Sequence, residues 1–221
     1  MSSHAEALRD NDARFAEFAP GVTAAQWAEA SLCSEWTNHQ VLADLVIGYQ
    51  AAVTSVAASM FRHHGSFNAA NTALARGLAA RRNTDELICD VPALARRPRG
   101  IGRIFPRRLL GDHVIHELDI AYSLGKESAI PASVIAAVLD TQVQIPNPFV
   151  PAAARARGLN LLAIDTDWCH CGHGPTVAGK ADHLASVLAG RPWALQFLTG
   201  DGAAVLAAAS NEKRGLRSVA G

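Results

Sequence analysis

A predicted helix between Pro106 and Gly125 carries a stripe of polar side chains bordered by apolar ones. Proline suits the first turn of a helix because its missing N–H would be unpaired there, and glycine is a common helix stop. Residues three or four apart share one helix face, and four polar residues share this one: Asp112, His116, Asp119 and Ser123. Its apolar borders indicate that the face points inward, where carboxylates and imidazoles need partners.

Asp112 and His116 are four residues apart, so their side chains can reach one metal ion from adjacent turns of a helix. A satisfied buried polar cluster without a metal is the alternative, and the spacing alone does not decide between the two. His113 and Glu117 fall on a different face of the same helix. We expect that second face to be exposed to solvent.

The segment from Asn38 to Arg62 is apolar almost all round, which predicts one buried helix. Its one acidic residue is Asp44, and small residues lie near it on the same face: Gly48, Ala51 and Ser55. A buried carboxylate is costly without a partner, and small neighbours leave room for an ion or a ligand. A hydrogen-bonded structural aspartate is the alternative interpretation of Asp44.

The chain divides into a helical part and a mixed part. Proline-rich residues 146–151 cannot form a helix, and they separate a helical bundle, residues 1–145, from a small α+β domain, residues 155–221. Further helices are predicted at 3–18, around Trp27, and at 67–82, 84–94 and 132–144. In the second part, patterns predict strands at 159–165 and 176–178, helices at 181–188 and 192–198, and a strand or helix at 203–208.

Composition narrows the classes of function. The 221 residues carry a formal net charge of zero, which gives no electrostatic support for binding nucleic acid or anionic membranes. No apolar run reaches the roughly 18 residues that span a bilayer, and the polar start of the chain lacks a signal-peptide pattern. We therefore expect a cytoplasmic protein, in which the four cysteines do not form a disulfide framework.

A cluster of cysteines and histidines and a cluster of arginines could each bind a ligand, but each also has an interpretation without one. Residues 169–173, Cys-His-Cys-Gly-His, contain zinc-favouring ligands, but the spacing is tight and incidental cysteines in a hairpin loop are the alternative. Six arginines crowd residues 96–108. They could receive an anionic ligand, or they could form a solvated loop.

Several motifs together resemble the mycothiol-dependent maleylpyruvate isomerase family, which belongs to the DinB-like metalloprotein superfamily. Residues 33–37 and 41–45, Cys-Ser-Glu-Trp-Thr and Val-Leu-Ala-Asp-Leu, resemble the family pattern Cys-Pro-Gly-Trp-Thr and Val-Leu-Ala-His-Leu. Residues 114–125 resemble the family's later Val-His-x-x-Asp-Ile…Leu-Gly helix. The tail from residue 163 to residue 202 is similar to the C-terminal region of many members. The motifs cover nearly the whole chain in the family's order.

This resemblance implies a mainly α fold: a DinB-like four-helix bundle that holds a metal in its core, followed by a small C-terminal α+β domain. The implied metal ligands are Asp44, Asp112 and His116, with Asp119 orienting His116 from behind. Asp44 replaces the usual histidine and Asp112 the usual, longer glutamate. Two carboxylates and one imidazole shift the preference from Zn²⁺ toward Mn²⁺, Fe²⁺ or Ni²⁺.

The resemblance also implies a function, namely a metal-dependent S-transferase or isomerase that uses mycothiol as cosubstrate and acts on a small electrophile. Its expected partners are a small-molecule thiol and that electrophile, without nucleic acid or membrane, and a homodimer is a possible assembly. The alternative is a non-catalytic small-molecule-binding or scaffold module in which the same side chains form only a buried network.

Overall fold

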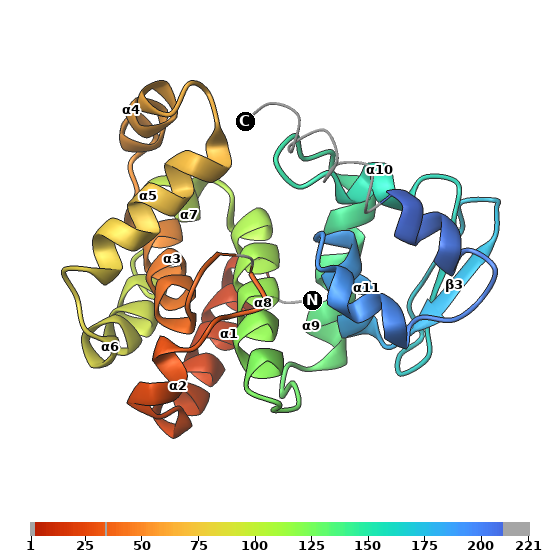
Figure 1. Cartoon of the computed structure of the whole chain (residues 1–221), viewed down its shortest axis with the longest axis horizontal. Helices are drawn as coiled ribbons and strands as arrows, with labels where there is room; N and C mark the ends of the chain where they lie inside the picture. Colours follow the sequence, from red (N-terminus) through yellow and green to blue (C-terminus); the bar gives the residue numbers. More distant parts are fainter. Residues whose placement is uncertain (1–2, 34, 210–221) are drawn as a thin grey trace. The chain divides into compact units, whose positions relative to one another are not determined.

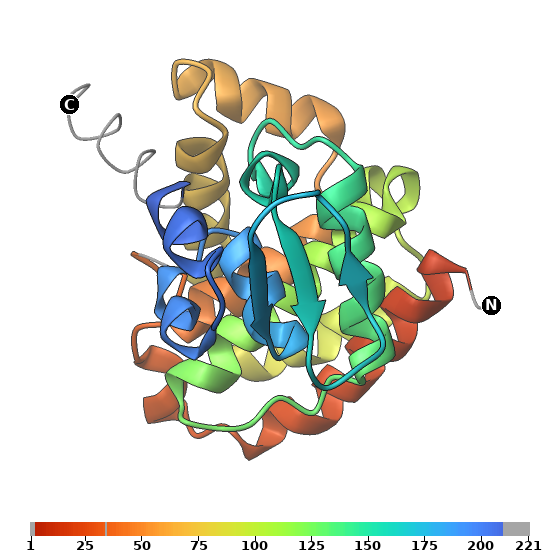
Figure 2. The same ribbon diagram turned by 90° about the vertical axis from the view of Figure 1, so that its right-hand side faces the viewer.

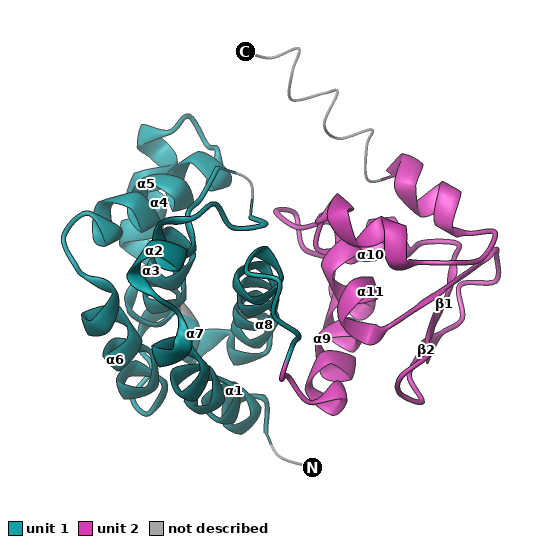
Figure 3. Ribbon diagram, turned by 60° about the horizontal axis from the view of Figure 1, so that its bottom comes forward, with its two compact units in different colours: residues 1–128 teal, residues 129–221 magenta. Residues whose placement is uncertain are grey.

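The computed structural model describes residues 3–33 and 35–209. Ser34, which falls within the motif at residues 33–37, lies outside the described residues, as does the C-terminal stretch 210–221. The chain separates into two compact units, Met1–Ser128 and Ala129–Gly221 (Figure 3). As the resemblance predicted, the fold is mainly helical, with a small sheet toward the C-terminus.

The described residues of the first unit form α-helices, most of which pack around its core (Figure 1). They are α1 (His4–Phe18), α2 (Ala24–Ala28), α3 (Asn38–Gln50), α4 (Val53–Arg62), α5 (Phe67–Ala79), α6 (Thr84–Ala95), α7 (Gly100–Ile104) and α8 (Pro106–Ser123). Helices α1, α8, α3 and α6 each pack against the next, and α6 packs back against α1. These four form the predicted bundle, while α5 lies against α3 and α4 lies against α5 at the periphery.

Local sequence signals fix where these helices begin. Ser3, Thr23 and Thr37 each accept a hydrogen bond from the backbone of the residue three positions on, whose side chain caps them in return. Asn83 does the same for α6. Pro106 begins α8 as predicted, and Gly125, with φ of +64°, follows its end.

The apolar segment 38–62 is two helices, so the prediction of one continuous helix was wrong. The chain is extended at Ala51, between α3 and α4. The segment around Arg99 and Gly100, where α7 begins, packs against this break. Gly100 approaches so closely that a Cβ on it would lie 2.1 Å from the carbonyl oxygen of Ala51, and Arg99 donates its N–H to the Tyr49 carbonyl at 3.0 Å.

Helix α8 is buried on more than one side, because it packs against both α1 and α3. His113 and Glu117 are only 1% and 4% exposed. The expectation that their face is solvent-exposed was therefore wrong. The sequence pattern suggested one inward face, whereas a helix between two neighbours has two.

The second unit places helices against a three-stranded sheet, as Figure 2 shows. Its elements are α9 (Ala132–Gln144), α10 (Ala152–Ala156), β1 (Asn160–Ala163), β2 (Cys169–His170), β3 (Thr176–Gly179) and α11 (Ala181–Leu188), then a 3-10 helix, Pro192–Phe197. The strand order is β2-β1-β3. Helix α11 packs on β1, β3 and α9, and residues 203–209 are helical.

Strand β3 runs parallel to β1, so residues 169–173 are not the loop of a hairpin between these two strands. The antiparallel partner is β2, which forms within residues that were expected to be a loop. Helix α9 also groups with the second unit, where it packs against α10 and α11, although the sequence analysis placed it within residues 1–145. In the ranges that the structure describes, no helix combines the length and apolar character needed to cross a membrane.

Candidate metal centre

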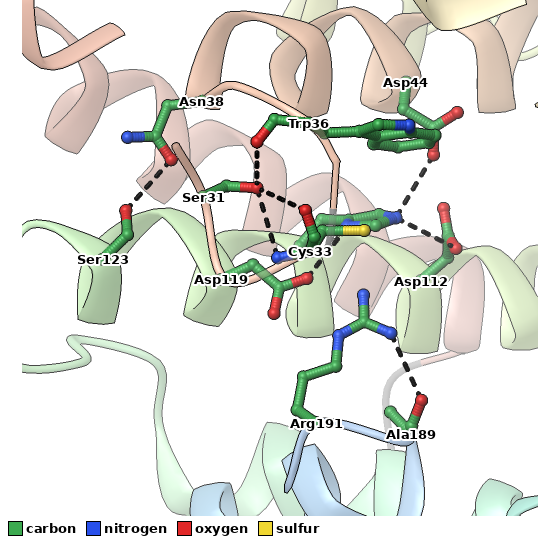
Figure 4. Close-up of polar contacts among 11 residues, drawn as sticks. Ser31, Cys33, Trp36, Asn38, Asp44, Asp112, Asp119, Ser123, Ala189 and Arg191 are labelled. Atoms are coloured by element: carbon green, nitrogen blue, oxygen red, sulfur yellow. Dashed lines mark hydrogen bonds and ion pairs between the residues drawn. The ribbon is translucent and has the colours of Figure 1, made fainter. Parts of the chain in front are cut away.

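Helices α3 and α8 bring together the three residues that the resemblance implied as metal ligands. The Nε2 atom of His116 lies 3.2 Å from Oδ2 of Asp44 and 3.7 Å from Oδ1 of Asp112 (Figure 4). Their candidate ligand atoms all lie within 4.8 Å of one another. Two donors bound to one ion at about 2.0–2.6 Å are themselves roughly 3–4 Å apart. The residues present therefore fit a divalent cation.

The three side chains differ in exposure. Asp44 and His116 are buried, with 4% and 7% of their side chains exposed, whereas 45% of Asp112 is exposed. The stripe on α8 predicted that Asp112 would point inward, and in this respect the prediction was wrong. Asp112 lies at the start of the stripe, where α8 still borders solvent. One edge of the cluster is thus exposed to solvent.

The other two residues of the stripe have different partners. Asp119 lies behind the imidazole, with its Oδ2 atom 3.2 Å from Nδ1 of His116. Ser123 does not join the cluster, because its hydroxyl contacts Asn38 Oδ1 at 3.0 Å and the Ile120 carbonyl at 2.8 Å. The predicted stripe therefore contributes three residues to the site and one to the packing of α3 on α8.

Trp36 covers the imidazole. Its ring stacks on that of His116, with 5.8 Å between centroids and 25° between planes, and its indole N–H donates to Thr72 Oγ1 at 3.1 Å. Trp36 is itself 7% exposed. The sequence analysis noted Trp36 only as part of a motif, and this contact gives it a role in fixing the plane of the His116 ring.

Cys33 is the second residue that the sequence analysis did not place in the site. Its sulfur, a His116 nitrogen and an Asp119 oxygen lie within 4.8 Å of one another. The Ser31 hydroxyl holds this loop, since it accepts from the Cys33 N–H at 3.2 Å and contacts the Trp36 carbonyl at 3.0 Å. The Leu32 N–H also donates to the Asp119 carbonyl, at 3.4 Å.

Charge dominates the electrostatics of His116. Burial alone would lower the pKa of its imidazole, but the nearby carboxylates of Asp112, Asp119 and Asp44, in that order, outweigh burial and raise the pKa well above the usual value. Cys33 adds to this effect. A site that attracts a proton this strongly also attracts another cation, because the same negative charges stabilise both.

A second buried network lies between α1, α3 and α8. Asp12 accepts hydrogen bonds from the Tyr49 hydroxyl and from Nδ1 of His113, the latter at 2.9 Å. Arg14 forms a two-pronged ion pair with Glu117. Burial raises the pKa of Tyr49, and Asp12 adds to the rise. Burial would lower the pKa of His113, but Asp12 outweighs it and raises the pKa. These pairs provide buried partners for Glu117 and for Nδ1 of His113, on the face of α8 that was expected to be exposed.

Residues 169–173 and the arginine-rich residues 96–108 do not form further metal sites among the described residues. Cys169 and Cys171 are exposed, and neither belongs to a described group of three potential ligands close enough to share an ion. The arginine-rich segment contains the short helix α7, and most of its arginine side chains are exposed. Neither observation assigns these clusters a ligand.

The fold and the site define a class of protein, namely a helical bundle with a candidate metal centre between two facing helices. The family model described as the mycothiol maleylpyruvate isomerase N-terminal domain matches residues 8–121. Because that match covers more than half of the chain, the chain belongs to this family, as the motifs predicted.

Solved structures support the same fold. A crystal structure of a mutant of mycothiol-dependent maleylpyruvate isomerase aligns with a TM-score of 0.57 at 16% identity, covering 90% of this chain and 92% of that one. A second crystal structure of mycothiol-dependent maleylpyruvate isomerase aligns with a TM-score of 0.53 at 15% identity, with the same coverage. At these identities the likeness establishes the fold alone. No curated protein sequence matches the chain.

Proposed function

We propose that this protein is a metal-dependent, mycothiol-using S-transferase or isomerase that acts on a small electrophile. The observation that carries the proposal is the convergence of Asp44, Asp112 and His116 in a member of the mycothiol maleylpyruvate isomerase family. These residues are the proposed ligands, and two carboxylates with one imidazole suit Mn²⁺, Fe²⁺ or Ni²⁺ as well as Zn²⁺.

A bound divalent cation would supply one piece of chemistry: it would lower the pKa of a coordinated thiol, so that a thiolate is present at neutral pH. The protein side chains hold and orient the groups around it. Asp119 accepts the Nδ1 proton of His116, which leaves the Nε2 lone pair directed at the proposed ion. Trp36 fixes the ring plane by stacking on it.

The exposure of Asp112 supports access to this site by small molecules. A site closed on all sides would leave no coordination position for a cosubstrate, and structural metal sites are closed in this way. Here the Asp112 edge borders solvent, whereas Asp44 and His116 stay buried. This asymmetry is what a site that takes up a thiol from solution and delivers it to an electrophile requires.

The test combines metal analysis with assays of activity. The purified protein should contain close to one divalent ion per chain, and the loaded protein should transfer mycothiol to 1-chloro-2,4-dinitrobenzene or isomerise maleylpyruvate. Asp44→Ala should lose both the ion and the activity. Asp10→Ala is the matched control, because Asp10 is an exposed aspartate of α1 and its loss should change neither.

A second variant separates this proposal from a non-catalytic binding or scaffold module. Asp44→His introduces the imidazole that the family pattern has at this position, and it should raise the affinity for Zn²⁺ without disturbing the fold. A wild-type protein that carries no ion, does not respond to chelator and gains no Zn²⁺ affinity from Asp44→His would favour the non-catalytic module.

A further inference from the structure

The two ring nitrogens of His116 face two different sets of potential metal ligands. Nε2 faces the carboxylates of Asp44 and Asp112. Nδ1 lies 3.2 Å from Asp119, and Asp119 shares a second set of close ligand atoms with Cys33. Figure 4 shows Asp119 and Asp112 toward opposite ends of the cluster. Asp119 approaches Nδ1, so we assign that nitrogen to the second set.

We propose that Cys33, His116 and Asp119 form a second metal site, which takes a soft cation such as Zn²⁺ and cannot be filled while the carboxylate set holds its own ion. This inference rests on the proposed function only in that the two sites share His116. It gives Asp119 a second role, as a ligand rather than as the residue that orients the imidazole.

The ligand types of the two sets favour different ions. A thiolate with an imidazole and one carboxylate suits Zn²⁺ and other soft or borderline ions. The set of Asp44, Asp112 and His116 has two carboxylates and no sulfur, so it accepts harder ions such as Mn²⁺. Within each set the ligand atoms lie within 4.8 Å of one another, so modest side-chain movement brings either set to bonding distances.

Mutual exclusion follows from the chemistry of a neutral imidazole, which has one nitrogen with a lone pair and one with a proton. When Nε2 binds an ion, Nδ1–H donates to Asp119. When Nδ1 binds an ion, Nε2–H donates to Asp44. Both carboxylates lie 3.2 Å from their nitrogen, so the protein provides an acceptor for either tautomer. A neutral ring therefore serves one site at a time, since an ion on each nitrogen would require loss of the remaining ring proton.

The loop that carries Cys33 is held in a way that suits this role. Within the loop, the Ser31 hydroxyl accepts from the Cys33 N–H. Two contacts join the loop to the site: the Leu32 N–H donates to the Asp119 carbonyl, and the Trp36 ring stacks on His116. Cys33 is half-buried, and its sulfur lies within 4.8 Å of a His116 nitrogen. A soft ion bound here withdraws His116 from the carboxylate set, and so acts as a competitive inhibitor of Mn²⁺-supported activity.

Co²⁺, a spectroscopic substitute for Zn²⁺, tests the second site through the charge-transfer absorption of a cobalt–thiolate bond. Chelator-treated protein with one equivalent of Co²⁺ should show this band, Cys33→Ser should abolish it, and Asp44→Asn should retain it. The double variant Cys169→Ser/Cys171→Ser is the control for the exposed cysteines and should keep the band. A band that survives Cys33→Ser would overturn the proposal.

The paramagnetic resonance signal of Mn²⁺ tests whether the two metal sites exclude each other. One equivalent of Zn²⁺ should release Mn²⁺ from the wild type, and Cys33→Ser should need at least about 10-fold more Zn²⁺ for the same release. Wild-type protein that holds Mn²⁺ and Zn²⁺ together would contradict the exclusion. If Mn²⁺ fails to bind while the Cys33-dependent cobalt band appears, the carboxylate site of the proposed function fails and the Cys33 site stands.

Discussion

Replacing Gly48 by alanine should disturb the contact that sets the distance between α3 and α8. Gly48 lies one turn after Asp44 on α3. A Cβ at this position would lie 2.5 Å from Cδ1 of Leu109 and 3.3 Å from Nε2 of His113, both on α8. Apolar carbons pack at about 3.5–4.0 Å, so Leu109 or the helix must move by roughly 1 Å.

Two opposing terms set the size of the effect. Alanine is favoured over glycine in a helix by about 0.8–1.0 kcal/mol, whereas overpacking of a filled core costs about 1–3 kcal/mol. Leu109 and His113 are 5% and 1% exposed, so neither side chain can move into solvent. We expect Gly48→Ala to lower the free energy of unfolding by about 1 kcal/mol, which corresponds to a fall in Tm of roughly 2–4 °C.

The matched control is Gly77→Ala on α5, where the nearest atom to an added Cβ is the flexible end of Arg81, at 3.7 Å. This change adds helix propensity without crowding and should raise Tm by roughly 2–4 °C. Thermal unfolding of both variants, followed by far-ultraviolet circular dichroism, measures the difference. Equal stabilisation by Gly48→Ala and Gly77→Ala would refute the close contact between α3 and α8.

Three further predictions concern the backbone, the second network and pH. Glu35 has φ of +71°, and the family pattern has glycine there; Glu35→Gly should raise the free energy of unfolding by about 1–2 kcal/mol in thermal melts, whereas Glu35→Ala keeps the strained backbone and should not. Arg14→Met removes the cation paired with the buried Glu117 carboxylate and leaves it only the Asn11 amide at 3.5 Å, so it should cost about 3–5 kcal/mol in urea unfolding. The more exposed Arg82→Met should cost less than about 1 kcal/mol. Burial already raises the pKa of Glu117, so the Arg14→Met penalty should be full where Glu117 is ionised and shrink as the pH falls and it protonates. Because the pKa of His116 is raised, protons compete with the metal for its imidazole even above about pH 6.5. The affinity for Mn²⁺, measured by calorimetry, should therefore keep rising until the pH exceeds the raised pKa. An affinity that stays constant over this pH interval would contradict the assignment of His116 as a metal ligand.

Helix boundaries were predictable where local signals set them. The bounds of Ala132–Gln144 and Ala181–Leu188 follow from Pro131 before the first and from Gly190, with φ of +91°, after the second. These residues act through their own backbone restrictions, so no tertiary information is needed. The strand at Asn160–Ala163 was equally visible, but its pairing was not, because strand order depends on which segments meet in space.

Other features have no local signal. Ala51 and Ala52 are good helix formers, yet α3 ends there, where Gly100, about fifty residues later, packs against the Ala51 carbonyl. In the same way, the polar partner of buried His113 is Asp12, which is 101 residues away in sequence. Hydrophobic periodicity detects a buried face but does not identify a polar partner on another helix.

The candidate site also contains residues that the sequence predicted and residues that only the structure placed there. His116, Asp112 and Asp44 were noticed as polar residues on predicted inward faces, and helix periodicity with the family motif was enough to group them. The positions of Cys33 and Trp36 depend on an irregular loop held by the Ser31 hydroxyl. Loop geometry of this kind cannot be derived from periodicity, so the sequence did not predict that these two residues lie in the candidate site.

The most direct test of the metal centre is the stoichiometry of Mn²⁺ bound at equilibrium dialysis by the chelator-treated wild type and by His116→Ala. We expect close to one ion per chain for the wild type and a loss of that ion in His116→Ala, with the helical circular dichroism signal retained. A wild type that binds no Mn²⁺, or a His116→Ala variant that binds it as tightly as the wild type, would contradict a metal centre at Asp44, Asp112 and His116.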